Sequence, residues 1–303
     1  MDDAALLDVS GPLAMSTDGY TVDPLEFPGG NIGSLAVHGT VNDVSMLGAK
    51  PLYLSCAFII EEGLPLDVLD RIVAAMGQTA QEAGVQIVTG DTKVVPKGAA
   101  DKVFITTTGI GKVLPVAAPS GHNARPGDAI LVSGSMGDHG LTILSQREGL
   151  SLSSDIASDS AALNRMVEAL ITEVSDIHVL RDPTRGGLAT TLNEIAGQSG
   201  AVCLVHEKDI PVKAGVRDGC SVLGLDPLYL ANEGKLICIL PEERAATALT
   251  VMQRFTQGKD AARIGSVLAP DAQMRAGQVL LQTPLGGKRL LGMLEGEQLP
   301  RIC

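Results

Sequence analysis

Polar and charged residues recur at the ends of apolar, strand-like runs of this sequence. The segment STDGY carries Asp18, and TGDTK places Gly90, Asp91, Thr92 and Lys93 directly after the apolar run VQIV. Ligands collect at the carboxyl ends of strands, where a rigid sheet positions the loop. There a carboxylate can hold Mg²⁺, a hydroxyl can bond a phosphate and an ammonium group can neutralise it. Taken singly, the TGDTK segment is more typical of an ordinary Gly-Asp turn, and Asp18 is indistinguishable from a turn residue.

Three segments of the C-terminal half have the same character. SGSMGDHG (133–140) is glycine-rich and carries His139, an arrangement that lets backbone N–H groups approach an anion. LRDPTRGG (180–187) and ANEGK (231–235) are alternatively explained by helix capping or by loop polarity. Together the segments predict a site for an anionic ligand with Mg²⁺, and they leave the reaction undefined. The candidates in the last two segments are Arg181, Asp182, Thr184, Gly186, Gly187, Asn232 and Glu233.

Two residues are unusual for the interior of a helix. Asn42 and Asp43 lie within SLAVHGTVNDVSML, which is otherwise helix-like. Their side chains compete for backbone hydrogen bonds, so both residue types are disfavoured there. An exposed surface pair and a functional pair are both compatible with this stretch.

The chain ends in PRIC, so its last residue is Cys303. A terminal residue has little to contribute to a core, and an exposed thiol is open to oxidation. Either the cysteine is accidental or it is a thiol on a tether that carries a group between sites. The other four cysteines form no CxxC pair, and three of them lie in apolar runs. This pattern favours buried thiols in a reducing compartment.

The composition excludes several classes of function. The net charge of −12, without clusters of Lys and Arg, argues against nucleic-acid binding. Aromatic residues make up only 2% of the chain, so base-stacking platforms are scarce. We find no signal segment and no stretch long enough to span a membrane. We therefore expect a cytoplasmic protein that binds neither nucleic acid nor membrane.

Glycine and proline divide the chain into strand-like and helix-like stretches, which predict an α/β (α+β) fold in two domains. In the first part we expect strands at 14–22, 52–60, 85–90 and 102–111, and helices at 33–47 and 67–83. In the second part we expect strands at 129–134, 201–206, 235–241 and 261–267, helices at 160–172, 187–198 and 242–256, and a hairpin at 279–291. The Pro- and Gly-rich segment 115–127 marks the boundary between the two predicted domains. The predicted units are residues 1–120, residues 121–290 and a flexible tail at 291–303.

The motifs resemble those of the HypE family of hydrogenase-maturation proteins. This family belongs to a superfamily of ATP-using enzymes with aminoimidazole ribonucleotide synthetase, selenophosphate synthetase and thiamine-monophosphate kinase. The ND, GDTK and RGG elements are common in the superfamily, whereas the PRIC ending is specific to HypE. The matching segments, from about residue 14 to the end, are STDGYTVDPLEFPGGNIG, HGTVNDV, YLSCAFIIEEGLP, IVTGDTKVV, ILVSGSMGDHG, LRDPTRGG, ANEGK and PRIC.

The resemblance implies a homodimer whose N-terminal sheets pair in a barrel-like core, with ATP in a cleft near the interface. It implies that Asp18, Asp43 and Asp91 hold Mg²⁺. It further implies that the cleft residues contact the nucleotide or line the reaction side. These residues are Asn42, Gly90, Thr92, Lys93, Arg181, Asp182, Thr184, Gly186, Gly187, Asn232 and Glu233.

The resemblance also implies a role for the terminal thiol. In the family, the carbamoyltransferase HypF loads a carbamoyl group onto the terminal cysteine, and ATP drives dehydration of this thiocarboxamide to a thiocyanate. The cyanide then passes to iron on the HypC–HypD complex. The amide oxygen must leave as phosphate and two N–H protons must be removed. Beside Cys303, the candidate catalytic groups are Glu233, Asp182 and His139.

One family feature is missing from the sequence. HypE proteins usually carry a glycine-rich segment near the start that closes over the ATP phosphates, and none precedes Ser16 here. We therefore expect ATP binding and turnover by this polypeptide to be compromised. The alternatives are a selenophosphate synthetase or a thiamine-monophosphate kinase, which leave PRIC unexplained, and a non-catalytic scaffold that presents Cys303. The sequence does not identify the general base, the resting position of the tail or the hydrogenase served.

Overall fold

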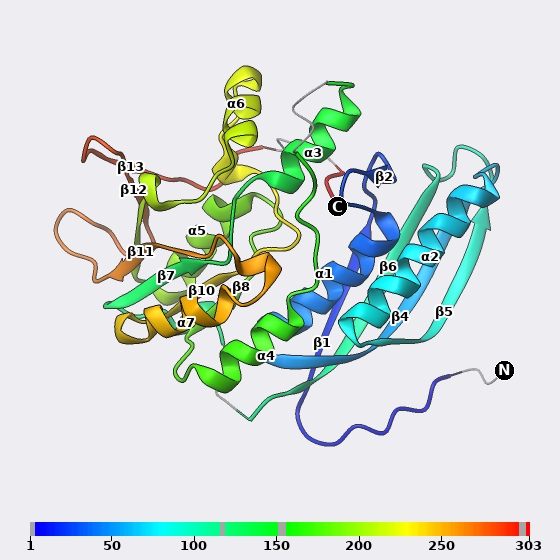
Figure 1. Ribbon diagram of the computed structural model, residues 1–303, viewed down its shortest axis with the longest axis horizontal. Helices are drawn as coiled ribbons and strands as arrows, with labels where there is room; N and C mark the ends of the chain where they lie inside the picture. Colours follow the sequence, from blue (N-terminus) through cyan, green and yellow to red (C-terminus); the bar gives the residue numbers. More distant parts are fainter. Residues whose placement is uncertain (1–3, 116–118, 151–155, 297–300) are drawn as a thin grey trace.

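The computed structural model describes residues 4–115, 119–150, 156–296 and 301–303, which form two large β-sheets with helices packed on them and one short pair of strands (Figure 1). The mixed α/β class in two units is confirmed. The sheet of four strands is formed entirely by residues up to Val113, and the sheet of seven strands begins at Asp128. Residues 297–300 of the expected tail, and 116–118 of the expected boundary segment, lie outside the described residues.

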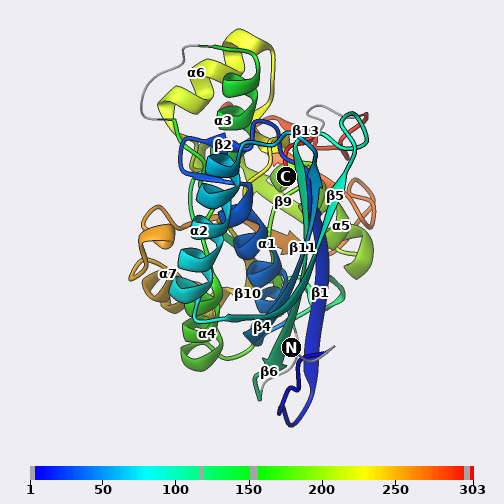
Figure 2. The same ribbon diagram turned by 90° about the vertical axis from the view of Figure 1, so that its right-hand side faces the viewer.

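The first sheet has the strand order β1-β6-β4-β5. Only β4 and β5 run parallel, and the other neighbours are antiparallel. Both long helices of this half, α1 and α2, pack on the same face of the sheet (Figure 2). The elements are β1 (Leu13–Tyr20), β2 (Glu26–Phe27), β3 (Gly30–Asn31), α1 (Ile32–Met46), β4 (Ala49–Glu61), α2 (Leu66–Ala83), β5 (Gln86–Val95) and β6 (Val103–Val113).

Local sequence signals define these helices. Asn31 caps α1, where its side chain accepts hydrogen bonds from the backbone of Gly33 and Ser34, and the Ser34 hydroxyl is 3.0 Å from the Asn31 backbone nitrogen, which donates to it. Helix α2 ends at Gly84, which adopts a left-handed conformation with φ of 76°. Helix α1 is buried on nearly all sides because it contacts α2, the sheet and the second half of the molecule.

The opposite face of the first sheet is not covered by any described element. Met15 is 65% exposed, Leu13 is 49% exposed and Ile59 is 42% exposed on this surface. They alternate with side chains that point toward α1 and α2, as the pleat of a strand requires. Exposed apolar side chains are thus gathered on one face of the sheet.

The second sheet has the order β13-β12-β9-β11-β7-β10-β8. Its interior strand β7 is buried on both faces: Ile130 and Val132 pack with α5, whereas Ala129 and Leu131 pack with α4 and α7. The strands are β7 (Asp128–Val132), β8 (Val179–Arg181), β9 (Val202–His206), β10 (Ile237–Pro241), β11 (Ala262–Leu268), β12 (Val279–Gln282) and β13 (Lys288–Leu290). The helices are α3 (Asp138–Arg147), α4 (Asn164–Glu173), α5 (Gly187–Ser199), α6 (Ala214–Leu223) and α7 (Ala245–Met252).

The predicted elements agree with the structure in most places. The predicted helix at 242–256 is shorter than expected, since α7 is flanked by single 3₁₀ turns, and α6 was not predicted. Among the described residues, no helix is long and apolar enough to cross a membrane. The chain returns to the middle of the molecule, and its last residue lies between the two halves (Figure 1).

Candidate active site

A cavity of about 240 Å³ lies between the two halves of the molecule. The first half contributes Asp18 from β1 and Asp43 from α1. The second half contributes the segment after β8, the beginning of α5 and Glu233. Cys303 completes the wall, so the cavity collects acidic groups around a thiol. The lining residues are Asp18, Gly39, Asp43, Arg181, Asp182, Thr184, Arg185, Thr191, Glu194, Glu233 and Cys303.

Two carboxyl groups from opposite halves meet in this cavity. Asp43 accepts a hydrogen bond of 2.7 Å from the Ser16 hydroxyl, and its carboxyl also lies within hydrogen-bonding reach of Asp182. Burial and the neighbouring Asp43 carboxylate raise the pKa of Asp182 to about 7, and burial also raises the pKa of Asp43. The two groups therefore share a proton near neutral pH. The repulsion between two such carboxylates is relieved when a divalent cation binds between their oxygens.

Glu233 is the most enclosed carboxyl group of the site. Its side chain is 4% exposed, and its Oε1 has no hydrogen-bond partner. Burial, together with the nearby Asp159 and Asp182 carboxylates, raises the pKa of Glu233 well above its ordinary value. A carboxylate in this environment is a strong base once it is ionised.

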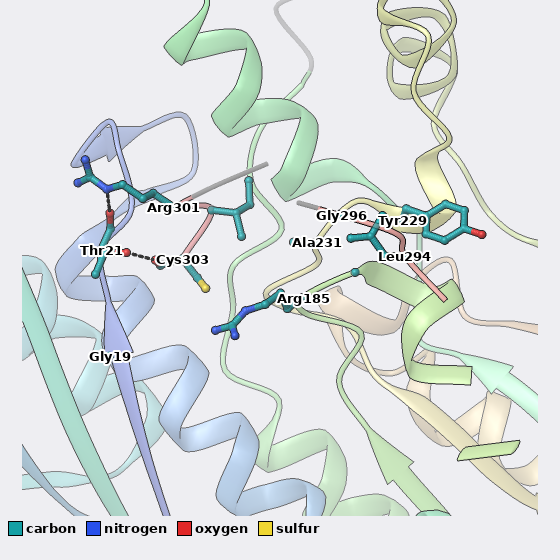
Figure 3. A pocket seen from close by; sticks show the side chains of 11 residues that line it. Gly19, Thr21, Arg185, Tyr229, Ala231, Leu294, Gly296, Arg301 and Cys303 are labelled. Carbon is teal, nitrogen blue, oxygen red and sulfur yellow. Dashed lines mark hydrogen bonds between the residues drawn. The ribbon is translucent and has the colours of Figure 1, made fainter. Parts of the chain in front are cut away.

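The thiol of Cys303 lies at the junction of the acidic cavity and a second pocket of about 360 Å³ (Figure 3). Burial and the carboxylates of Glu233 and Asp18 raise the pKa of the thiol to about 12, while a hydrogen bond from Arg185 lowers it. Figure 3 shows the sulfur directed away from Thr21 and toward the Arg185 side chain. The thiol is therefore held as S–H, next to groups that could act on a substituent attached to it.

The start of α5 forms one wall of both pockets. Gly186 and Gly187 have φ of 74° and 61°, the left-handed region that favours glycine. A Cβ on Gly187 would lie 2.5 Å from the Leu230 carbonyl oxygen, so a side chain is excluded there. This turn places Arg185 beside the thiol. Arg181 instead donates a hydrogen bond of 2.6 Å to Glu194 at the rim of the acidic cavity.

Two of the predicted nucleotide contacts have structural roles. Asn42 donates hydrogen bonds to the carbonyls of Ala161 and Glu233, and its oxygen accepts one from the Leu163 nitrogen. Asn232 is fully buried, accepts from the Gly137 nitrogen and donates to backbone carbonyls. Neither amide lines the acidic cavity, because both are occupied in joining backbone segments.

His139 does not reach the thiol. Its Nε2 lies 2.8 Å from the carbonyl oxygen of Ile302, and its Nδ1 lies 2.7 Å from the Ser158 hydroxyl. A carbonyl can only accept, so Nε2 carries the proton and Nδ1 accepts from Ser158. Burial lowers the pKa of His139, which keeps this neutral tautomer.

The GDTK segment lies away from the acidic cavity. Asp91 lies on the uncovered sheet face, bonded to Lys93 and to the Thr92 nitrogen. Asp91 pairs with Ala57 of β4, and Ala57 pairs with Thr106 of β6. Thr106 pairs with Gly19 of β1, so a line of paired residues crosses the sheet. Three inter-strand spacings, about 14 Å, therefore separate Asp91 from β1.

The predicted Mg²⁺ ligands are thus not assembled within one chain. Asp18 points to the helix-covered side of the sheet and Asp91 to the open side. Among the described residues, no three His, Cys, Asp or Glu side chains are arranged so that they could hold a metal ion. Gly90 is required by packing, since its Cβ would lie 2.2 Å from the Cys56 carbonyl oxygen.

Three site residues were given no role from the sequence. Arg185 was recognisable only as part of the LRDPTRGG segment, whereas Ser16 and Thr21 carry no signal that distinguishes them from strand residues. Ser16 bonds Asp43, and Thr21 bonds the Cys303 carbonyl through both its backbone nitrogen and its hydroxyl. The role of Ser16 follows from the packing of α1 on β1, and that of Thr21 from the return of the chain end to the segment after β1.

Comparison with known proteins places this arrangement in a family. Residues 1–113 match the AIR synthase related protein N-terminal domain, and residues 125–274 match the corresponding C-terminal domain. The chain is 57% identical over 293 residues to the carbamoyl dehydratase HypE of Azotobacter vinelandii, which covers 97% of this chain and 85% of the relative.

Two solved structures extend the comparison. A hydrogenase maturation protein HypE in complex with ATP is 71% identical, with a TM-score of 0.98 over 100% of this chain and 90% of that chain. A HypE–HypF complex is 48% identical, with a TM-score of 0.89 over 93% and 90% of the two chains. The fold and the two matched domains define a member of the AIR synthase related proteins. Within that group, the chain belongs to the HypE family.

Proposed function

We propose that this protein is an ATP-dependent carbamoyl dehydratase that converts a thiocarboxamide on Cys303 to a thiocyanate for nickel–iron hydrogenase maturation. The observation that carries the proposal is the position of the Cys303 thiol, at the edge of a cavity lined by Asp18, Asp43, Asp182 and Glu233. A group attached to this sulfur extends directly among these carboxyl groups. The names of the relatives and the ATP complex of a HypE support the same activity.

The reaction follows from the balance of atoms. The amide oxygen of the thiocarboxamide attacks the γ-phosphate of ATP, and its C–O bond breaks as phosphate leaves. Both N–H protons are lost, which leaves a C≡N triple bond on the sulfur. The products are the thiocyanate, ADP, phosphate and one net proton. Glu233 is suited to accept an N–H proton because its Oε1 is unpaired and its pKa is raised.

We propose that the acidic residues hold a magnesium ion together with the phosphate oxygens of the nucleotide, since among the described residues no three carboxylates form a metal site by themselves. Asp43 and Asp182 form a buried carboxyl pair whose repulsion a divalent cation would remove. Asp18, which lines the same cavity, is the third candidate ligand. When bound, Mg²⁺ supplies charge neutralisation for the transferring phosphoryl group.

We further propose that the protein acts as a homodimer through its uncovered sheet face. The exposed Leu13, Met15 and Ile59 give this face the apolar character of an interface. Two four-stranded sheets that face each other close into a barrel when the β1 edge of one copy adjoins the β5 edge of the other. In such a dimer the β5 edge of one copy, which carries Asp91 and Lys93, would lie next to the β1 edge of the other copy, which carries Asp18.

The carrier role of Cys303 requires partners on either side of the reaction. A HypF-type carbamoyltransferase would load the thiol, and the solved HypE–HypF complex of a relative supports this partner. A HypC–HypD iron scaffold would accept the cyanide.

An intact-protein mass spectrum tests the proposal. The protein is incubated with the carbamoyl-donating partner and then with Mg-ATP. We expect an adduct on the C-terminal peptide that becomes one water lighter after ATP is added. The Cys303→Ala variant should form no adduct and should unfold at the wild-type midpoint. An adduct that never loses water would instead support a scaffold that only carries the group.

A further inference from the structure

A further cavity of about 440 Å³ lies beside α1, apart from the acidic cavity. Its walls come from α1, the end of α2, the first turn of α4 and the segment after α7, and we call it the α1–α4 cavity. Figure 2 shows α2, α4 and α7 on one side of α1 and β1 on the other. Among the described residues, this cavity and the acidic cavity have no lining residue in common. Its volume is in the range of sites that bind small molecules.

Two arginines line the α1–α4 cavity. Arg165 is exposed and its Nη2 donates to the Glu82 carbonyl oxygen at 2.9 Å, but it forms no ion pair with a carboxylate of the described residues. Arg254 is held by Glu173, whose two oxygens accept from its Nη1 and Nη2 at 2.9 and 2.5 Å. A guanidinium group has five N–H donors, so both arginines retain donors for a ligand. The one carboxylate in the described lining is that of Glu82, which leaves positive charge in excess.

His38 supplies an imidazole to the same cavity. Its Nδ1 lies 2.9 Å from the Ser160 hydroxyl, and its Nε2 forms no hydrogen bond with any described residue. Burial lowers the pKa of His38 to about 4, so the ring is neutral at pH 7. One ring nitrogen is therefore enclosed and without a protein partner, at the wall of a polar cavity.

The first turn of α4 adds backbone donors. The helix begins at Asn164, and its N-cap residue, Leu163, forms no side-chain hydrogen bond to it. Residues 164–166 line the cavity, so the N–H groups of this turn lie at its wall. The partial positive charge of a helix N-terminus favours an anion. Here it adds to the charge of the two arginines.

We propose that the α1–α4 cavity is a binding site for the phosphate group of a small molecule. Phosphate oxygens accept hydrogen bonds from guanidinium groups, imidazole N–H groups and the backbone of a helix N-terminus, and this cavity offers all three. A volume of about 440 Å³ leaves room for an organic part attached to the phosphate. The site is separate from the chemistry at Cys303 and does not depend on the proposed dehydration.

NMR of the imidazole rings measures this binding in the full chain. Inorganic phosphate is titrated at pH 7 into protein with isotopically labelled histidine, and the His38 resonances are identified by their loss in His38→Gln. We expect these resonances to shift saturably toward those of a protonated ring, because a neighbouring negative charge favours the protonated form. Phosphate bound beside Cys303 would instead shift His139, which contacts the Ile302 carbonyl oxygen. The two sites are therefore observed separately in one titration.

Three variants of the lining change its charge in opposite directions. Arg165→Gln and Arg254→Gln should each weaken phosphate binding about tenfold, since each removes a charged donor. Glu82→Gln should strengthen binding about threefold, because it removes the carboxylate that repels the anion. The matched control is Arg263→Gln, which breaks the distant ion pair with Glu242 and should leave phosphate binding unchanged.

Two further probes show to what the phosphate belongs. Adenosine monophosphate that binds more tightly than inorganic phosphate would identify a nucleotide ligand, whereas equal binding would show that only the phosphate group is recognised. Adenosine itself should not shift the His38 resonances, and adenosine that binds as tightly as its monophosphate would overturn the proposal. His38 resonances that do not move at tens of millimolar phosphate, or equal affinity in the wild type and both arginine variants, would also overturn it.

Discussion

The buried carboxyl pair predicts that Asp182→Asn stabilises the folded protein at alkaline pH. The pKa of Asp182 rises from 3.8 to about 7 on folding. Between these values the folded state binds more protons than the unfolded chain, so the free energy of unfolding falls as pH rises from about 4 to about 7. Asparagine makes no such contribution to the pH dependence of the free energy of unfolding, because it is neutral in both the folded and the unfolded state.

The size of the effect follows from the shift. About three pKa units correspond to roughly 4 kcal/mol, and we expect about half of that, since Asp182 is partly exposed to the cavity and water there lowers the penalty. The variant should therefore be about 2 kcal/mol more stable than the wild type at pH 8. The difference should shrink toward zero as pH falls to 4.

Urea unfolding followed by circular dichroism measures this difference, with divalent cations removed by a chelator. Circular dichroism is preferred because the chain has no Trp. The control is Glu173→Gln: Arg254 holds the pKa of that exposed carboxyl below its ordinary value, so its loss should not stabilise the protein at any pH. If Asp182→Asn lowers stability equally at pH 4 and pH 8, the carboxyl pair is not under electrostatic strain and the reasoning is wrong.

Three further predictions concern the site and the interface. Glu233→Gln should slow dehydration by about 100-fold or more while the carbamoyl adduct still forms, because a general base is lost; a rapid single-turnover reaction followed by mass spectrometry would exclude Glu233 as the base. Asp91→Asn should weaken Mg-ATP binding measured by calorimetry without changing the unfolding midpoint, since its side chain is 61% exposed; unchanged nucleotide affinity would remove Asp91 from the site. Met15→Lys places a charge on the uncovered sheet face and should shift sedimentation from dimer to monomer, and a persistent dimer would show that another surface pairs the copies.

The helices of the N-terminal half could be predicted well from the sequence. The apolar positions of the predicted helix at 67–83 recur at helical spacing and Gly84 ends it, and α2 spans Leu66–Ala83. The amphipathic α6 was missed because its short pattern, Ala214–Leu223, is interrupted by Gly219. Elements with strong periodicity and clear end signals are therefore the ones that a sequence defines.

The composition of the site was only partly predictable. Asp18, Asp43, Asp182 and Glu233 come together as expected, although no local pattern relates segments so far apart in the chain. Asp91 was grouped with them because it also lies at a strand end. The sequence could not show which face of the pleat it occupies, since that depends on strand pairing. Asn42 and Asn232 were grouped with them because a buried amide that joins backbone segments has the same sequence signal as a ligand.

The position of Asn42 has a consequence for motion. Its amide joins α1 to the Ala161, Leu163 and Glu233 segments, and α1 itself packs against both halves of the molecule. Opening the cleft by rotation of one half against the other would break these buried bonds together. Domain hinges of that kind open in microseconds to milliseconds, whereas a chain terminus moves in nanoseconds to microseconds. The cavity between the halves therefore keeps its shape for as long as the hydrogen bonds of Asn42 hold.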